Sequence, residues 1–212
     1  MISYNLFVLP KSKHGDRTVQ VYAALYDSED VFLIVRKREL NTWWANKGGK
    51  GALSAPTLVN QAGQYAFPGG KKESGETDIS AAKREFEEET GKPFPKYNTV
   101  QQYKWKYFTL VAFEVTDNHT SLMWEIDAGL KPAKANPNAP TNSEIADWEI
   151  CDALLSPLDQ LLTFLGNKVG TSQQVAGALS RAKKYSQDID WYKSMAEALQ
   201  KHHAAKHATV NF

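Results

Sequence analysis

Residues 70–91 read GKKESGETDISAAKREFEEETG, and this stretch decides the fold of the chain. Thr77 is a suitable N-cap residue for a helix that begins at the next position. Gly91 suits the C′ position, where the backbone turns left-handed, and Pro93 cannot continue a helix. Together these signals predict a helix over residues 78–90.

Three acidic residues of this helix share one of its faces. Glu85, Glu88 and Glu89 are three and four positions apart, so their side chains cluster. They lie beside the apolar stripe expected to pack on a sheet, formed by Ile79, Ala82 and Phe86. Like charges at such spacings cost about 0.2–0.5 kcal/mol per pair, and the C-terminal half of a helix disfavours anions further. A hard divalent cation such as Mg²⁺ or Mn²⁺ would relieve this strain, because both metals prefer carboxylate oxygens.

The pattern of fixed residues extends beyond the three acids. A Phe-Pro-Gly-Gly lead-in ends at Gly70, and the stretch then resembles the signature of the Nudix hydrolase superfamily. That signature is a glycine, a glutamate and then Arg-Glu-x-x-Glu-Glu-x-Gly. Its positions in this chain are Gly70, Glu76, Arg84, Glu85, Glu88, Glu89 and Gly91. The family pattern has an apolar residue next, where this chain has Lys92, a departure that concerns packing after the helix.

The resemblance implies an α/β (α+β) fold, an α/β/α sandwich with a mixed β-sheet. We expect a Nudix domain over residues 1–166 and a C-terminal helical extension over 167–212, which packs on the core or forms a homodimer interface. Hydrophobic patterns predict the other elements. Strands are expected at 3–9, 18–26, 31–36, 107–115 and 144–150; helices at 157–166, 172–185 and 190–203; and long loops at 38–64 and 131–141.

The resemblance also implies a reaction, the Mg²⁺- or Mn²⁺-dependent hydrolysis of the diphosphate linkage in a nucleoside diphosphate derivative. Water would attack phosphorus. The metal ligands would be Glu85, Glu88, Glu89 and the backbone carbonyl of Gly69. Arg84 would orient the acids, and Glu76 would support the geometry of the loop and the helix. One of the glutamates, Glu88 or Glu89, or a carboxylate from elsewhere would help to deprotonate the water.

Candidates outside the signature each have an alternative. Glu144 lies where related enzymes present a further carboxylate to the metal, or it is a solvated residue at a strand edge. Arg36 and Arg38 follow a strand and are candidates for phosphate binding, with surface charge as the alternative. Tyr107 has a spacing that resembles the tyrosine marker of dinucleoside polyphosphate hydrolases, or it packs in the core. The Trp43-Trp44 pair either stacks on a base or packs on the core.

The net charge and the cysteine count of the sequence disfavour several classes of protein. The 25 basic and 24 acidic residues among 212 give a net charge of +1, which disfavours a general binder of nucleic acid or membrane. A single cysteine, Cys151, excludes an internal disulfide, and we expect it to be a small buried residue. The start of the chain lacks the features of a signal peptide, so we expect a cytoplasmic protein.

Two readings of the function are open. The first is an enzyme that acts on a nucleoside diphosphate sugar such as ADP-ribose, a dinucleoside polyphosphate or a nucleoside triphosphate. The second is a non-catalytic Nudix-fold regulator or binding module that senses a nucleotide. The intact acidic helix favours the enzyme, and the sequence leaves the substrate undecided.

Overall fold

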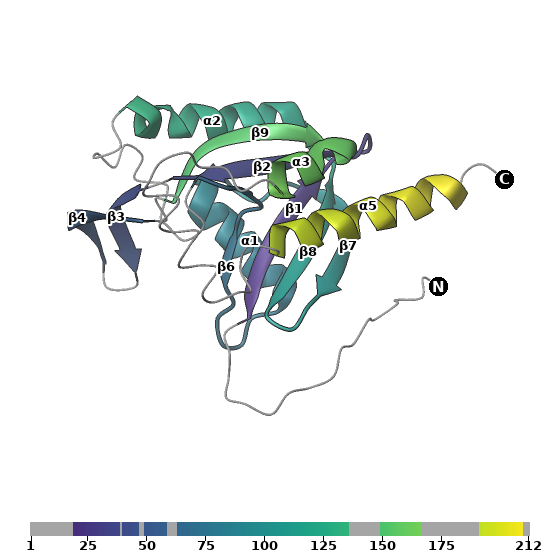
Figure 1. Cartoon of the computed structure of the whole chain (residues 1–212), viewed down its shortest axis with the longest axis horizontal. Coiled ribbons are helices and arrows are strands. Elements are labelled where there is room, and N and C mark those ends of the chain that lie inside the picture. The colour runs from purple at the N-terminus through teal and green to yellow at the C-terminus, as the bar shows by residue number, and fades with distance from the viewer. Residues whose placement is uncertain are drawn as a thin grey trace.

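A mixed β-sheet with helices packed on it forms the body of the protein (Figure 1). The computed structural model describes residues 19–38, 40–46, 49–58, 63–135, 149–166 and 191–209. Within this part the sheet strands are β1 (Gln20–Tyr26), β2 (Val31–Lys37), β5 (Tyr65–Ala66), β6 (Gly69–Lys71), β7 (Tyr97–Lys104), β8 (Phe108–Val115) and β9 (Ile150–Pro157). A separate hairpin consists of β3 (Leu40–Asn46) and β4 (Gly49–Leu58). The helices are α1 (Asp78–Thr90), α2 (His119–Ala135), the short 3₁₀ turn η1 (Leu158–Gln160), α3 (Leu161–Gly166) and α5 (Trp191–Thr209).

The centre of the sheet is the strand pair β1 and β8, which run parallel from Gln20↔Phe108 to Tyr26↔Glu114. The other strand pairs of this sheet are antiparallel, so the sheet is mixed, as predicted. Residues 21–26 of β1 are all buried, on both faces of the strand. A strand that reads as a continuous apolar run is typical of a sheet covered on both sides.

Helices cover the two faces of this sheet. Figure 1 shows α5 crossing in front of β1 and β8, while α1 lies behind the strands. The residues of α5 that face the sheet recur at helical spacing and are buried; they are Tyr192, Met195, Ala196 and Leu199. The ring of Tyr192 meets the edge of Tyr22 on β1, with centroids 5.5 Å apart. The predicted helix at 190–203 and the predicted helical turn after residue 157 are therefore confirmed.

A buried contact between a histidine and an aspartate joins α5 to the turn between β1 and β2. Nδ1 of His203 lies 2.6 Å from Oδ1 of Asp30, and both side chains are less than a tenth exposed. The His203 ring also packs edge-on against Tyr26 and Phe32. Asp30 has a φ of 58°, a left-handed conformation that is uncommon for a residue other than glycine. These contacts fix the last described helix to the first hairpin.

Several described elements differ from the predicted ones. The expected loop at 38–64 contains the β3–β4 hairpin, so that prediction was wrong for most of its length. Strand β7 was missed because its side chains alternate poorly and are half-buried or exposed at the edge of the sheet. Helix α2 was missed although the Asn118 side chain caps it at Ser121, and it extends into the expected loop at 131–141. Strand β9 runs to Pro157, beyond the strand expected at 144–150.

Some predictions lie outside the described residues. They are the strand at 3–9, the helix at 172–185 and residues 144–148 of the expected strand. The division of the chain at residue 166 stays a prediction. In the part of the chain that the structure describes, no helix has the length and apolar character needed to cross a membrane.

The Asp30–His203 pair gives a first prediction about stability. His203→Ala should lower the free energy of unfolding by about 3–5 kcal/mol, because it leaves a buried carboxylate without this partner. Denaturant unfolding measures the effect. A matched change on the same helix is Lys193→Ala, which breaks an exposed pair with Glu197 at 3.8 Å and should cost less than about 0.5 kcal/mol. Equal losses in the two variants would contradict the role given to the buried pair.

Candidate active site

Helix α1 carries the acidic cluster, and local signals set both of its ends. The Thr77 side chain accepts from the Ser80 backbone N–H at 3.0 Å, and the Ser80 hydroxyl accepts from the Thr77 N–H at 2.9 Å. This reciprocal capping box begins the helix at Asp78. Gly91 ends it with a φ of 67°, a left-handed conformation that glycine adopts without strain. The predicted helix, its N-cap and its terminal glycine are confirmed.

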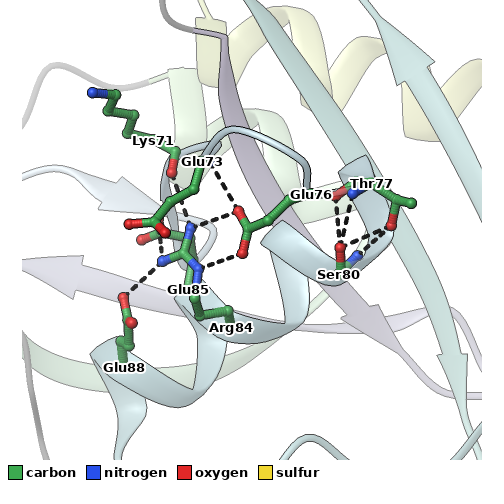
Figure 2. Close-up of polar contacts among 8 residues, drawn as sticks. All are labelled: Lys71, Glu73, Glu76, Thr77, Ser80, Arg84, Glu85 and Glu88. Carbon is green, nitrogen blue, oxygen red and sulfur yellow. Dashed lines mark hydrogen bonds and ion pairs between the residues drawn. The ribbon is translucent and has the colours of Figure 1, made fainter.

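Arg84 gathers three of the glutamates around one guanidinium group (Figure 2). Its Nε and one terminal nitrogen donate to the two oxygens of Glu76, at 2.7 and 3.0 Å. Its other terminal nitrogen donates to Glu85 and to Glu88, both at 2.8 Å. A further bond of 3.0 Å reaches the backbone carbonyl of Lys71. All five N–H groups of a guanidinium therefore have an acceptor.

These contacts explain how Glu76 and Arg84 shape the site. Glu76 also accepts from the Glu73 N–H at 2.9 Å, so the loop before α1 is folded around the ion pair. The hydrogen bonds that Arg84 donates to Glu76, with the charges of Glu85 and Glu88, hold the pKa of Arg84 above its ordinary value. A charge-assisted, bidentate pair of this kind fixes direction as well as distance. The side chain of Arg84 is 26% exposed, which places the pair at the edge of the site and not in free solution.

Glu89 is held in a different way from the other two acids of the cluster. Its Oε2 accepts from the Gly69 N–H at 2.9 Å, and the residue is 2% exposed. Glu85 is also buried, at 8%, whereas the Glu88 side chain is 44% exposed. The expectation that the cluster lies partly buried on the flank of the apolar stripe is met. Strand β6 thereby brings Gly69 against the acidic face of α1.

A second cation and a further carboxylate, both missed by the sequence analysis, complete the site. The ammonium of Lys37, at the end of β2, lies 2.6 Å from Glu149 and 4.0 Å from Glu89. Burial alone would lower the pKa of Lys37, but the charges of Glu149 and Glu89 outweigh it and raise that pKa above its ordinary value. A lysine that ends an otherwise apolar strand was the available signal. Nothing in the sequence places Glu149 beside it.

The two cations correct one part of the sequence analysis. A divalent cation was expected to relieve the repulsion among the glutamates of the helix. In the structure Arg84 compensates Glu85 and Glu88, and Lys37 lies beside Glu89. The protein itself therefore relieves much of the repulsion, and a metal would have to exchange with contacts that already exist.

The remaining candidates make other contacts or lie outside the described residues. Arg36 is half-buried and donates to the Gly63 carbonyl at 3.5 Å. Arg38 is buried, so the alternative of a surface charge was wrong, and it donates to the Ile150 carbonyl at 3.2 Å. Tyr107 precedes β8, with the Lys106 ammonium 4.8 Å from its ring centre. Their roles toward substrate stay predictions.

Glu144 and the side chains of the tryptophan pair at 43–44 are not among those described, so their predicted roles are untested. Cys151 is half-buried, so the prediction of a fully buried residue was wrong, and as the single cysteine it forms no internal disulfide. Its Sγ lies 3.6 Å from the Arg36 carbonyl. Cys151 lies on strand β9 and is assigned no role in the site.

The donor set of the acidic cluster fits a hard divalent cation. Carboxylate oxygens are the ligands that Mg²⁺ and Mn²⁺ prefer, and two of the three glutamates are already buried. Gly70 adds a cradle, because a Cβ at this position would lie 2.3 Å from Oε2 of Glu85. Among the described residues no three Asp, Glu, His or Cys side chains are arranged to hold a metal as they stand. The three glutamates instead contact Arg84, Lys37 and the Gly69 N–H.

The model of the NUDIX domain family matches residues 16–169, which is most of the chain. The chain belongs to the Nudix family. Its acidic helix α1 is the helix of the Nudix signature, and the mixed sheet with flanking helices is the fold that the signature predicted. Among curated proteins no match is found.

Solved structures with a similar fold are distant in sequence. A mutT/nudix family protein from Listeria innocua is 15% identical, with a TM-score of 0.43 over 81% of this chain and 98% of that chain. A MutT protein from Methanosarcina mazei is 15% identical, with a TM-score of 0.40 over 84% and 100%. An Ap4A hydrolase from C. elegans is 10% identical, with a TM-score of 0.38 over 78% and 96%. Likenesses this remote give no information on the substrate.

Two adjacent glycines should respond differently to substitution. A Cβ at Gly69 would lie 2.2 Å from the Val21 carbonyl oxygen, which is backbone, so Gly69→Ala should cost about 1–3 kcal/mol in denaturant unfolding. A Cβ at Gly70 meets only the end of the Glu85 side chain. Gly70→Ala should therefore cost less than about 1 kcal/mol and instead displace the Glu85 carboxylate. Isothermal titration with Mn²⁺ should then show about tenfold weaker binding. Equal destabilisation of the two variants would contradict this distinction.

Proposed function

We propose that this Nudix protein is a divalent-metal-dependent hydrolase that cleaves the diphosphate linkage of a nucleotide derivative. The observation that carries the proposal is the arrangement of the acidic face of α1. Arg84 orients Glu85 and Glu88, while the Gly69 N–H orients Glu89. A structural helix would have no need of two buried carboxylates aligned by separate donors.

In this proposal Glu85, Glu88, Glu89 and the Gly69 carbonyl hold Mg²⁺ or Mn²⁺. A bound divalent cation neutralises phosphate charge and lowers the pKa of water, so it supplies the nucleophile. Arg84 keeps two carboxylates in place through a planar fork that lysine cannot reproduce. Glu76 in turn fixes Arg84 by accepting two hydrogen bonds from it.

The proton of the attacking water needs an acceptor among the carboxylates of the site. We assign this role to Glu88, because its side chain is the most exposed of the three. Glu89 is 2% exposed, so it is suited to holding the metal rather than to exchanging protons with solvent. Glu144, which lies outside the described residues, is the further carboxylate proposed for the same step.

The proposed substrate is a nucleoside diphosphate sugar such as ADP-ribose, or a dinucleoside polyphosphate. Arg36 and Arg38, on and just after β2, and Tyr107, beside the start of β8, are the residues proposed to contact it. The net charge of +1 supports a small-molecule substrate over a nucleic acid. A screen of ADP-ribose, diadenosine tetraphosphate and nucleoside triphosphates with Mg²⁺, analysed by chromatography of the products, tests the proposal. Nucleotide binding without turnover of any of them would indicate the non-catalytic module.

Substitution of single glutamates tests the site once a substrate is found. Glu88→Gln and Glu89→Gln should each lower kcat by roughly 100-fold or more, because each removes a charged ligand worth several kcal/mol at the metal. Glu87→Gln is the matched control. Glu87 is exposed on the same helix, and its Oε1 accepts from the Phe94 N–H at 2.8 Å, away from the cluster. Full activity in both site variants would show that the residues are assigned wrongly.

Metal binding should also be visible without any substrate. At a Mn²⁺ or Mg²⁺ concentration of about 100 times Kd, the folded state gains about 2.7 kcal/mol. This corresponds to a rise in Tm of roughly 5 °C or more for a chain of this size. Differential scanning fluorimetry should record the rise, and excess EDTA should reverse it. A Tm that does not change with either metal would contradict a metal site on α1.

A further inference from the structure

The buried ammonium of Lys37 is unusual because it lies beside a carboxylate proposed to bind a cation. The Lys37 side chain is 7% exposed, and its Nζ is 4.0 Å from Oε1 of Glu89. The other oxygen of Glu89 accepts from the Gly69 N–H. The oxygen nearest to Lys37 is therefore the one that is not taken up by this backbone donor.

The pairing of β2 with β9 sets the position of Lys37. The register changes between Arg36↔Asp152 and Lys37↔Ile150, so β9 has one additional residue at this point. Such a bulge redirects a side chain, and bulges are frequent next to active sites. A bond of 2.7 Å from the Arg38 N–H to the Glu149 carbonyl then fixes the turn that precedes β9. The bulge and this backbone bond together position Lys37 and Glu149 for their contact at one end of the sheet.

The Lys37 ammonium interacts with two carboxylates, those of Glu149 and Glu89. Glu149 is the nearer partner, at 2.6 Å, and its side chain is 28% exposed. The Tyr22 phenol, which is buried beside the same groups, interacts with both Lys37 and Glu89. A divalent cation on Glu89 would lie close to a positive charge in a poorly hydrated place, where repulsion is strong. The negative charge of Glu149 offsets part of the positive potential of Lys37 and so reduces the repulsion between Lys37 and the cation.

We propose that Lys37 is a resident counter-ion of Glu89, which holds this carboxylate in place without metal and competes with the metal for it. Lys37 thereby sets the metal affinity of the site, and Glu149 moderates the competition. The inference rests on the proposed metal site and names a positioning residue for it. Lys37 acts through Glu89 and is not assigned any contact with substrate.

Titration of the purified protein with Mn²⁺ alone tests the inference, by calorimetry and by the Mn²⁺ dependence of Tm. Lys37→Met removes the charge and keeps an unbranched, apolar side chain of similar length, so Mn²⁺ should bind about tenfold more tightly or better. Lys104→Met is the matched control. It removes the same charge from Lys104, which lies 2.6 Å from Asp78 in the first turn of α1, and should change Kd less than about threefold.

Substitution of Glu149 should act in the opposite direction. Glu149→Gln leaves the ammonium with Glu89 as its charged partner, so Mn²⁺ should bind more weakly than in the unchanged protein. The double variant K37M/E149Q removes both charges of the pair, a change that buried pairs often tolerate. It should bind Mn²⁺ about tenfold more tightly than E149Q. This comparison decides the question even if Lys37→Met alone does not fold.

The outcomes separate this inference from the proposed function. If the unchanged protein binds Mn²⁺ and neither Lys37 substitution tightens the binding, the counter-ion role is wrong and the metal site stands. If neither the unchanged protein nor any variant binds Mn²⁺, the metal-dependent function fails and the inference fails with it. If only the variants without Lys37 bind Mn²⁺, the competition by Lys37 is confirmed, and the metal-dependent function proposed for the unchanged protein fails.

Discussion

Three glutamates crowd one face of α1, and neighbouring cations must offset their negative charges. Glu85, Glu88 and Glu89 lie in the second half of α1, where the helix dipole and their mutual repulsion both disfavour them. Arg84 forms ion pairs with Glu85 and Glu88, and Lys37 lies beside Glu89. The loop between β6 and α1, the end of β2 and the turn before β9 are all arranged so that these cations reach the helix.

The two cations are not interchangeable, and their places reflect their chemistry. Arg84 faces acceptors in several directions at the partly exposed edge, where a planar group with five donors can satisfy Glu76 and two further acids at once. Lys37 faces a narrower, buried space between Glu89 and Glu149. A compact ammonium on a flexible stem fits there, and it can shift between two acceptors without moving the backbone.

The sequence predicted the parts of the site whose geometry is local. The bounds of α1 follow from Thr77 and Gly91, and the contact of Arg84 with Glu88 follows from helical spacing. Lys37 and Glu149 could not be paired in advance, because their contact depends on the register of β2 against β9, which no short-range pattern records. The edge strand β7 and the hairpin β3–β4 were missed for a related reason, since their pairing and not their hydrophobic pattern defines them.

The position of α5 has a consequence for the order in which the protein is built. This helix is the last described element, yet it covers β1, the first described strand, and holds the turn between β1 and β2 through the Asp30–His203 pair. During synthesis, the face of β1 that α5 covers therefore stays without this helix until residues 191–209 have been made. Apolar surface that is exposed during folding makes an intermediate prone to aggregation. Contacts so distant in sequence also slow folding, because the connecting chain must be ordered before they form.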